Sequence, residues 1–512
     1  MAMSKFQKRG GEDVDFPRMS GLLLHPTSLP GPYGIGDLGE AAYRWVDTLV
    51  QARQQIWQIL PLGPTGYGDS PYQTHSAFAG NLLLLDLEPL ARAGYVPPGA
   101  LEAAPSFPAD RVDYGQLIRW KVPLLLSAHE RFEAVADAAE RQAFEAFCDA
   151  HDAVWLHDYA LFMALKAEFG GAPWDQWPPE VRCREFGALA HWSVRLAPQV
   201  MAHKFVQYLF FRQWGALKAY ANERGVRILG DMPIYVAYDS ADVWANQHLF
   251  HLDEEGRPTV VAGVPPDYFS PTGQRWGNPI YRWDRMEAEG FRWWVERFRI
   301  ARQMVDIVRL DHFRGFEAYY EIPAEEETAV QGRWVKGPGA ALFRAIFREL
   351  GEFPIVAEDL GVITEEVERL RRQFGFPGMK VLQFAFSSDH TNPYLPHNYE
   401  PDCVVYTGTH DNDTTVGWFA TAPESERAHC LRYLGYQPDD IAWALIRLAS
   451  ASVARLAIFP VQDVLSLGSE ARMNTPGRPE GNWQWRLQPQ MLTEAILAWL
   501  AEVTETYGRA PM

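Results

Sequence analysis

Short apolar runs that end in polar or turn-forming residues recur eight times along this 512-residue chain, and they constrain its fold more than any other feature. Helical patterns, with apolar residues every three or four positions, lie between most of these runs, as at residues 38–52, 291–303, 340–350, 365–374 and 439–451. Strands that alternate with helices predict a parallel sheet, and eight such units indicate a closed (β/α)8 barrel. The predicted strands are residues 21–25, 56–61, 226–231, 305–311, 354–358, 379–386, 403–409 and 456–462.

The spacing of the predicted strands is uneven, which indicates insertions between them. Residues 62–225 are far longer than one connecting helix needs, and helical patterns at 114–132, 140–169 and 198–223 predict a mainly helical inserted subdomain. Residues 232–285 are rich in Pro, Gly and aromatic residues, which predicts a long functional loop over the active site. We expect residues 1–19 to be a flexible N-terminal segment and residues 20–512 to form the catalytic barrel.

Composition excludes several classes of partner. A net charge of −18 argues against nucleic acid and anionic membranes. No apolar run reaches the length of a membrane span, and the first twenty residues lack the apolar core of a signal peptide. The four cysteines are scattered without a Cys-x-x-Cys pair, which is typical of free thiols in a reducing compartment. We therefore expect a cytoplasmic protein.

Acidic side chains follow several predicted strands, at the end where a barrel gathers its active site. Asp231 ends the third strand, Asp311 the fourth and Glu358 the fifth, while residues 409–413 end the seventh with His410 and Asp411. A ring of carboxylates serves either metal binding or acid–base work on sugars. A plainer interpretation of Asp311 alone is a residue that caps the next helix or pairs with a nearby arginine.

Asp311 and Glu358 fit the two roles that cleavage of a glycosidic bond requires. In retaining enzymes a nucleophilic carboxylate and a protonated carboxyl lie roughly 5–5.5 Å apart, which adjacent barrel strands can provide. Arg309, two residues before Asp311 on the same face of its strand, would keep Asp311 ionised. The apolar residues 355–357 before Glu358 favour its protonated form. Asp359 could replace Glu358, but strand alternation would turn it away.

These residues lie in recognisable motifs. Arg309-x-Asp311, Glu358 within Ala-Glu-Asp-Leu-Gly and the pair His410-Asp411 resemble, in order, three of the four motifs of the α-amylase superfamily. Further stretches at residues 22–36, 63–73, 263–279, 473–477 and 482–483 resemble one branch of it, the amylomaltase or 4-α-glucanotransferase family. The resemblance extends from about residue 20 to the C-terminal region, so it is specific.

The resemblance implies a role for each of these residues. Asp311 would be the nucleophile, Glu358 the general acid and base, and Asp411 the third acid that stabilises an oxocarbenium-like transition state. Residues expected to bind substrate are Ser70, Tyr72, Gln73, Asp231, Tyr268, Phe269, Gln274, Trp276, Arg309, His410 and Asn482, with Tyr72 as a stacking platform. Tyr67 and Tyr114 match a second glucan-binding surface of some members. The implied substrates are α-1,4-glucans and maltooligosaccharides as donors and glucose or maltooligosaccharides as acceptors, with no cofactor.

The third strand departs from ordinary α-amylases. Residues 230–235 read Gly-Asp-Met-Pro-Ile-Tyr and lack the Asn-His pair that helps to bind calcium there. Residues 411–413 alternate acid and amide and could ligate a cation, but no further ligands follow at fixed spacing. We therefore expect no metal.

Two other functions remain open from the sequence. A plain α-glucan hydrolase would share the three carboxylates, and a non-catalytic glucan-binding protein would keep the aromatic residues but lose a carboxylate. Transfer requires that water be excluded while an acceptor enters, and residues 263–279 are the candidate for that exclusion.

Overall fold

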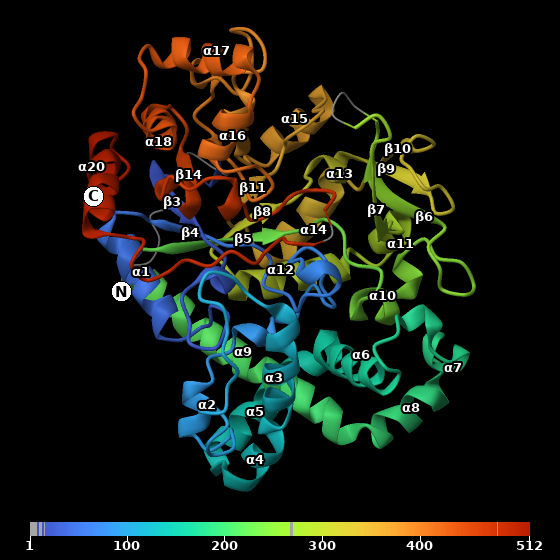
Figure 1. Cartoon of the computed structure of the whole chain (residues 1–512). Coiled ribbons are helices and arrows are strands. Elements are labelled where there is room, and N and C mark those ends of the chain that lie inside the picture. Colours follow the sequence, from blue (N-terminus) through green and yellow to red (C-terminus); the bar gives the residue numbers. More distant parts are fainter. Residues whose placement is uncertain (1–7, 10–12, 15, 267–269, 479, 512) are drawn as a thin grey trace.

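The computed structural model describes residues 8–9, 13–14, 16–266, 270–478 and 480–511 (Figure 1). Eight parallel strands form its central sheet, in the order β11-β8-β5-β4-β3-β14-β13-β12. All eight predicted strands are confirmed, as β3 (Met19–Leu23), β4 (Ile56–Gln58), β5 (Arg227–Met232), β8 (Ile307–Leu310), β11 (Ile355–Ala357), β12 (Gly378–Val381), β13 (Cys403–Tyr406) and β14 (Leu456–Pro460). At the remaining seam Ala357 N–H donates to Pro377 O just before β12, at 2.9 Å, which brings the two edge strands together as a barrel.

Apolar side chains of the strands pack on both faces of the sheet, as expected for parallel strands. Alternate residues such as Leu456 and Ile458 of β14 face the barrel interior with Ile307 and Val356. The residue between them, Ala457, faces the outer layer of helices. The period of two along each strand therefore separates a barrel core from a strand–helix core.

The helices predicted between the strands are confirmed to within a few residues at their ends. They are α1 (Glu40–Gln51), α12 (Arg292–Met304), α14 (Ala340–Leu350), α15 (Glu365–Gln373) and α18 (Ile441–Ala451). In α14 the buried residues Leu342, Phe343 and Ile346 lie on one face, and Arg348 lies on the other. Further helices after β8, β13 and β14 are α13 (Arg314–Glu317), α16 (Thr415–Thr421), α17 (Glu424–Leu434), α19 (Val461–Val464) and α20 (Glu494–Thr506).

The segment between β4 and β5 is helical, as expected. It contains α2 (Glu88–Arg92), α3 (Tyr114–Leu126), α4 (Ala128–Val135), α5 (Ala138–His151), α6 (His157–Glu168), α7 (Pro179–Arg182), α8 (Phe186–Arg195) and α9 (Ala197–Glu223). The long helix α9 contacts both α1 beside the barrel and α3 to α6 in the insertion, so it joins the two (Figure 1). The helical pattern predicted over residues 114–132 is confirmed as two successive helices, α3 and α4, which Ser127 separates; its hydroxyl donates to Leu124 O.

Residues 232–285 contain more regular structure than the predicted loop. They hold α10 (Ala241–Ala245), β6 (Val260–Val264), β7 (Gln274–Pro279) and α11 (Trp283–Ala288). Strands β6 and β7 join β9 (Ala318–Pro323) and β10 (Arg333–Lys336) in a four-stranded antiparallel sheet of order β10-β9-β6-β7. The expectation of an irregular loop was wrong over β6 and β7, because β6 pairs with β9, a strand that follows β8 in the chain. Near the N-terminus, β1 (Lys8–Arg9) pairs with β2 (Asp13–Val14).

Within the described residues, every helix is too short or too polar to cross a membrane.

Arg509 anchors the C-terminal segment to the barrel at the N-terminal ends of its strands. Its side chain is wholly buried, and it donates to Met19 O of β3 at 3.0 Å, to Ser450 O of α18 at 2.9 Å and to Ala454 O at 2.9 Å. Arg18 also donates to the carbonyls of Ser450 and Ala454, at 2.7 Å and 3.2 Å, so the two guanidinium groups together satisfy these buried acceptors.

We expect Arg509→Met to lower the free energy of unfolding by about 2 kcal/mol or more, because several buried carbonyls lose one of their donors. Urea denaturation measures the change. The matched control is Glu505→Gln, which removes a half-exposed ion pair with Arg53 in the same terminal segment and should cost less than about 1 kcal/mol. Equal losses in the two variants would contradict this role of Arg509.

Candidate active site

Asp311 and Glu358 leave neighbouring barrel strands at the same level. Strand β8 pairs with β11 so that Leu310 lies opposite Ala357, and the two acids are the next residues of each strand. Glu358 N–H donates to Leu310 O at 2.9 Å, which extends the pairing to the acids themselves. The two carboxyl groups predicted to act together are therefore brought together by strand register.

The guanidinium of Arg309 holds two carboxylates. Its Nη1 lies 2.6 Å from Asp231 Oδ2 and 2.9 Å from Asp311 Oδ1. Arg309 and Asp231 are almost completely buried, whereas 28% of the Asp311 side chain is exposed. Burial lowers the pKa of Arg309, but the charges of Asp231 and Asp311 outweigh it and hold that pKa above its ordinary value. Asp311 does pair with an arginine, as the plainer interpretation held, yet its side chain stays partly exposed.

Glu358 lies in an environment that favours its proton. Burial, followed by the negative charge of Asp311, raises its pKa from 4.5 to about 7, although Arg309 and two backbone donors oppose the change. These donors are Leu360 N–H to Oε1 at 2.9 Å and His312 N–H to Oε2 at 2.7 Å. His312 has a φ of 51°, a left-handed conformation that is unusual for a residue with a side chain. The carboxyl of Glu358 is thus held in place and can carry a proton near neutral pH.

Asp359 points away from Glu358, as alternation predicts. Its Oδ1 accepts from Met379 N–H at 2.7 Å, and its Oδ2 lies 3.1 Å from Arg371 Nε. Asp359 therefore supports the start of β12.

A chain of polar contacts connects Asp231 to Asp411. The hydroxyl of Tyr72 donates to Asp231 Oδ2 at 2.7 Å and lies 3.3 Å from His410 Nδ1. His410 Nε2 lies 3.4 Å from Asp411 Oδ1. The rings of Tyr72 and His410 stack with centroids 4.9 Å apart. Burial, together with the charge of Asp231, raises the pKa of Tyr72, so its hydroxyl keeps the proton that it donates.

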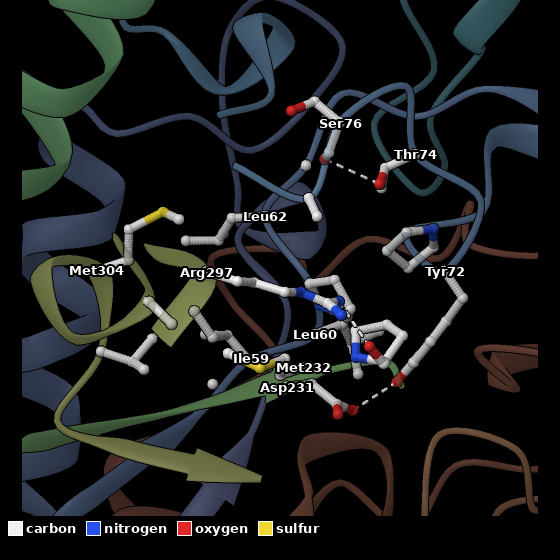
Figure 2. A pocket seen from close by; sticks show the side chains of 18 of the residues that line it. Ile59, Leu60, Leu62, Tyr72, Thr74, Ser76, Asp231, Met232, Arg297 and Met304 are labelled. Carbon is white, nitrogen blue, oxygen red and sulfur yellow. Dashed lines mark hydrogen bonds between the residues drawn. The ribbon is translucent and has the colours of Figure 1, made fainter. Parts of the chain in front are cut away.

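A pocket lies against the Tyr72–Asp231 pair (Figure 2). Leu62, Met232 and Met304 contribute apolar side chains to its wall. Arg297 of α12 reaches into the same region and donates to Pro233 O at 2.5 Å and Ile234 O at 3.2 Å. Helix α12 thereby fixes the chain that leaves β5 directly after Asp231.

The residues around Tyr72 form the turn that presents it. Ser70 Oγ accepts from Tyr72 N–H at 3.2 Å, and Gln73 N–H donates to Ser70 O at 3.1 Å. The ring of Trp483, which has a φ of 63°, lies 5.9 Å from that of Tyr72 and 6.0 Å from that of His410. Trp483 is thus a third aromatic residue of this cluster.

Trp276 and Gln274 approach from the antiparallel sheet. Both lie on β7, and Trp276 Nε1–H donates to Gln274 Oε1 at 3.1 Å. The ring of Trp276 meets that of His312 edge to face at 4.9 Å, next to Asp311. The structure thus brings Trp276 to the residue that follows Asp311, with Gln274 bonded to Trp276. His312 itself was missed, although it directly follows Asp311 in the sequence.

Other predicted residues bond to neighbouring segments or lie outside the described part of the chain. Asn482 bonds within its own segment, since its Oδ1 accepts from Thr475 N–H and its Nδ2 donates to Arg478 O. Tyr114 is only 5% exposed and donates to Trp483 O, so its ring is not a surface platform here, and a second glucan site at this residue stays a prediction. Tyr268, Phe269 and the side chain of Tyr67 lie outside the described residues.

Across the part of the chain that the structure describes, no group of three His, Cys, Asp or Glu residues could hold a metal ion. Asp413 accepts from Thr414 N–H at 2.8 Å and from Ser469 Oγ at 2.7 Å, and Asn412 Oδ1 accepts from Thr409. These residues therefore serve the local backbone and the neighbouring segment.

Comparisons with known proteins agree with the geometry of this site. A family model described as 4-alpha-glucanotransferase matches residues 24–493. The chain is 60% identical over 503 residues to a 4-alpha-glucanotransferase of Thermus thermophilus, with 96% of this chain and 100% of that protein covered. It is 54% identical to one from Synechocystis, with 96% and 98% covered. An amylomaltase of Streptococcus agalactiae in complex with acarbose superposes with a TM-score of 0.93 at 41% identity, covering 96% of this chain and 100% of that one.

The raised pKa of Glu358 predicts a dependence of stability on pH. Between pH 4.5 and about 7 the folded protein binds a proton at Glu358 that the unfolded chain has released. The free energy of unfolding of the wild type, minus that of Glu358→Gln, should therefore be about 2–3 kcal/mol lower at pH 8 than at pH 5. Urea denaturation of both proteins at the two pH values measures this difference. A change in stability that the amide causes equally at both pH values cancels in the comparison.

The control is Glu365→Gln, at a carboxyl whose side chain is 86% exposed. Its difference from the wild type should not change with pH. If the difference in unfolding free energy between Glu358→Gln and the wild type is also the same at pH 5 and pH 8, Glu358 does not hold a proton near neutral pH.

Proposed function

The chain belongs to the 4-alpha-glucanotransferase family, and from this premise we propose that Asp311, Glu358 and Asp411 carry out its reaction. The activity follows from the family: the protein is a 4-alpha-glucanotransferase acting on α-1,4-glucans and maltooligosaccharides. The assignment of the residues rests on one observation. Two carboxyl groups at adjacent register positions differ in environment, one paired with Arg309 and the other with a pKa raised to about 7.

In the first half of the reaction, the donor glucan loses its leaving chain. Glu358 gives its proton to the glycosidic oxygen while Asp311 attacks the anomeric carbon from the opposite face. The bond from carbon to glycosidic oxygen breaks, and an ester bond between the sugar and Asp311 forms. The released chain leaves with a free 4-hydroxyl group, and Glu358 is left as a carboxylate.

In the second half, an acceptor replaces the released chain. The carboxylate of Glu358 takes the proton of the acceptor's 4-hydroxyl group, and that oxygen attacks the anomeric carbon. The ester bond to Asp311 breaks and a new α-1,4 bond forms. Glu358 is protonated again, so the cycle closes without a cofactor. Maltooligosaccharides serve as donors, and glucose or maltooligosaccharides serve as acceptors.

The remaining polar groups bind the sugar at the cleaved bond. Asp411 lies at the end of the contact chain with a half-exposed carboxylate, suited to accept sugar hydroxyl groups and to stabilise positive charge on the ring. Tyr72 offers a ring for stacking, and Asp231 balances Arg309 so that the pocket does not repel a developing cation. Arg309 and His410 complete this set.

Hydrolysis is the second candidate, because it would use the same acids with water as acceptor. The family membership does not favour it. Strand β7 carries Trp276 to His312 beside the acids, and residues 263–279 include this strand, which supports their role in keeping water from the glycosyl-enzyme. A non-catalytic binding protein is not favoured either, because all three acids are present.

The cysteines support a proposed cytoplasmic location. Cys148, Cys183, Cys403 and Cys430 are free thiols. Free thiols persist in reducing compartments, which is the sole basis of this proposal.

We expect Asp311→Asn to lower kcat with maltotriose by about a thousand-fold or more, because the amide cannot form the ester. Binding of maltotriose, measured by calorimetry, should persist. Asp402→Asn, at an exposed acid beside Arg455, is the control and should keep full activity. The wild type should convert maltotriose into glucose and longer maltooligosaccharides. Products that are all shorter than maltotriose would identify a hydrolase, and full activity of Asp311→Asn would refute the nucleophile.

Glu358→Ala should trap the intermediate when the donor needs no acid. Maltosyl fluoride loses fluoride without a proton, so the first half of the reaction can proceed. Without a base the acceptor attacks slowly, and a maltosyl adduct should accumulate. Intact-mass spectrometry detects the added mass, and peptide mapping should place it on Asp311. An adduct on another residue would contradict the assignment.

A further inference from the structure

The segment after α19 returns to the end of β13 and contacts Asp411 at its side chain and its backbone. Asn474 Nδ2 donates to Asp411 Oδ1 at 2.7 Å. Arg472 Nη2 donates to Asp411 O at 2.6 Å, and Arg472 Nε donates to Asn474 O at 2.6 Å. The guanidinium thus bridges the backbones of the two residues whose side chains meet.

Asp411 needs such support because its own surroundings restrain it weakly. About half of its side chain, 52%, is exposed, and His410 Nε2 approaches Oδ1 only at 3.4 Å. An exposed carboxylate samples several rotamers unless a donor selects one. The contacts of His410 and Asn474 both reach Oδ1, so they leave Oδ2 available to a sugar hydroxyl.

The donor is itself held in place. Trp483 N–H donates to Met473 O at 2.8 Å, and Thr475 N–H donates to Asn482 Oδ1 at 2.9 Å. Residues on both sides of Asn474 are therefore tied to the 482–483 turn, whose Trp483 ring lies near Tyr72 and His410. Residues 472–474 and 482–483 thus contact Asp411 at the end of the polar chain and lie beside Tyr72 and His410 within it.

We propose that Asn474 is a positioning residue that fixes the rotamer of Asp411, so that Oδ2 faces the sugar at the cleaved bond. This inference rests on the proposed role of Asp411 as the third acid. A neutral amide suits the task, because it orients the carboxylate without cancelling the charge that stabilises the transition state. A lysine or arginine at the same place would form an ion pair and compete with the sugar for that charge.

Asn474→Ala should lower kcat about ten- to a hundred-fold, because a misdirected Asp411 stabilises the transition state poorly. KM should change much less, and the melting temperature should stay close to that of the wild type. Ser469→Ala is the matched control. It removes a 2.7 Å bond to Asp413 between the same two segments, without a contact to Asp411. Its kcat should equal that of the wild type.

Asn474→Asp provides a readout that a structural role would not produce. Two carboxyl groups at this distance share one proton, and the protonated form can still donate to Asp411. As pH rises and that proton is lost, the two charges repel and Asp411 turns away. The kcat of this variant, relative to the wild type, should therefore fall as pH rises and recover at low pH.

The outcomes distinguish the proposed role of Asn474 from the proposed role of Asp411, on which it rests. Wild-type kcat in Asn474→Ala, or equal losses in Asn474→Ala and Ser469→Ala, would overturn the role of Asn474. An Asn474→Asp activity that follows the wild-type pH profile would overturn it as well. Asp411→Asn serves as the reference: if it keeps wild-type kcat, the failure lies in the assignment of Asp411, and the role of Asn474 falls with it.

Discussion

The buried ion pair between Arg309 and Asp231 is the constraint on which the rest of the site depends. Burying a guanidinium costs several kcal/mol unless a counter-charge and hydrogen bonds offset it. Asp231, with no exposed side-chain surface, lies 2.6 Å away and supplies that offset. Strand register sets this distance, because Asp231 of β5 pairs directly with Arg309 of β8. The same nitrogen, Arg309 Nη1, also lies 2.9 Å from Asp311 Oδ1, so the two acids share one buried cation.

The surrounding charges then give the carboxyl groups of Asp311 and Glu358 different environments. Asp311 lies 2.9 Å from the guanidinium of Arg309. Glu358, one strand away, lies next to that carboxylate and away from bulk water, which favours the acid. The negative charge of Asp311 thus helps to raise the pKa of Glu358. A neutral residue at position 309 would disturb both groups, although Arg309 itself transfers no proton.

The parts of the structure that follow local patterns could be predicted from the sequence. Apolar runs predicted all eight strands, and the strand ends predicted that Asp311 and Glu358 would be neighbours. The sheet formed by β6, β7, β9 and β10 could not be predicted, because β6 pairs with β9, which lies beyond β8 in the chain. The contact between Asp411 and Asn474 joins residues 63 positions apart, and no periodicity indicates it. The motif at residues 473–477 marked the segment without indicating which atoms it contacts.

The site residues lie on segments that differ in how firmly they are held, and this arrangement suits a reaction that transfers a glucan from one chain to another. Asp311 and Glu358, the proposed nucleophile and general acid, are fixed by the hydrogen bonds of adjacent strands, which hold their backbones at a constant spacing. Asp411, Tyr72 and Trp276 follow strand ends or lie on inserted segments, where small movements are less costly. A glycosyl-enzyme must release one chain and admit another without admitting water. A rigid pair of acids surrounded by binding groups on separate segments suits that exchange, because a shift of one segment would leave the positions of the two acids unchanged.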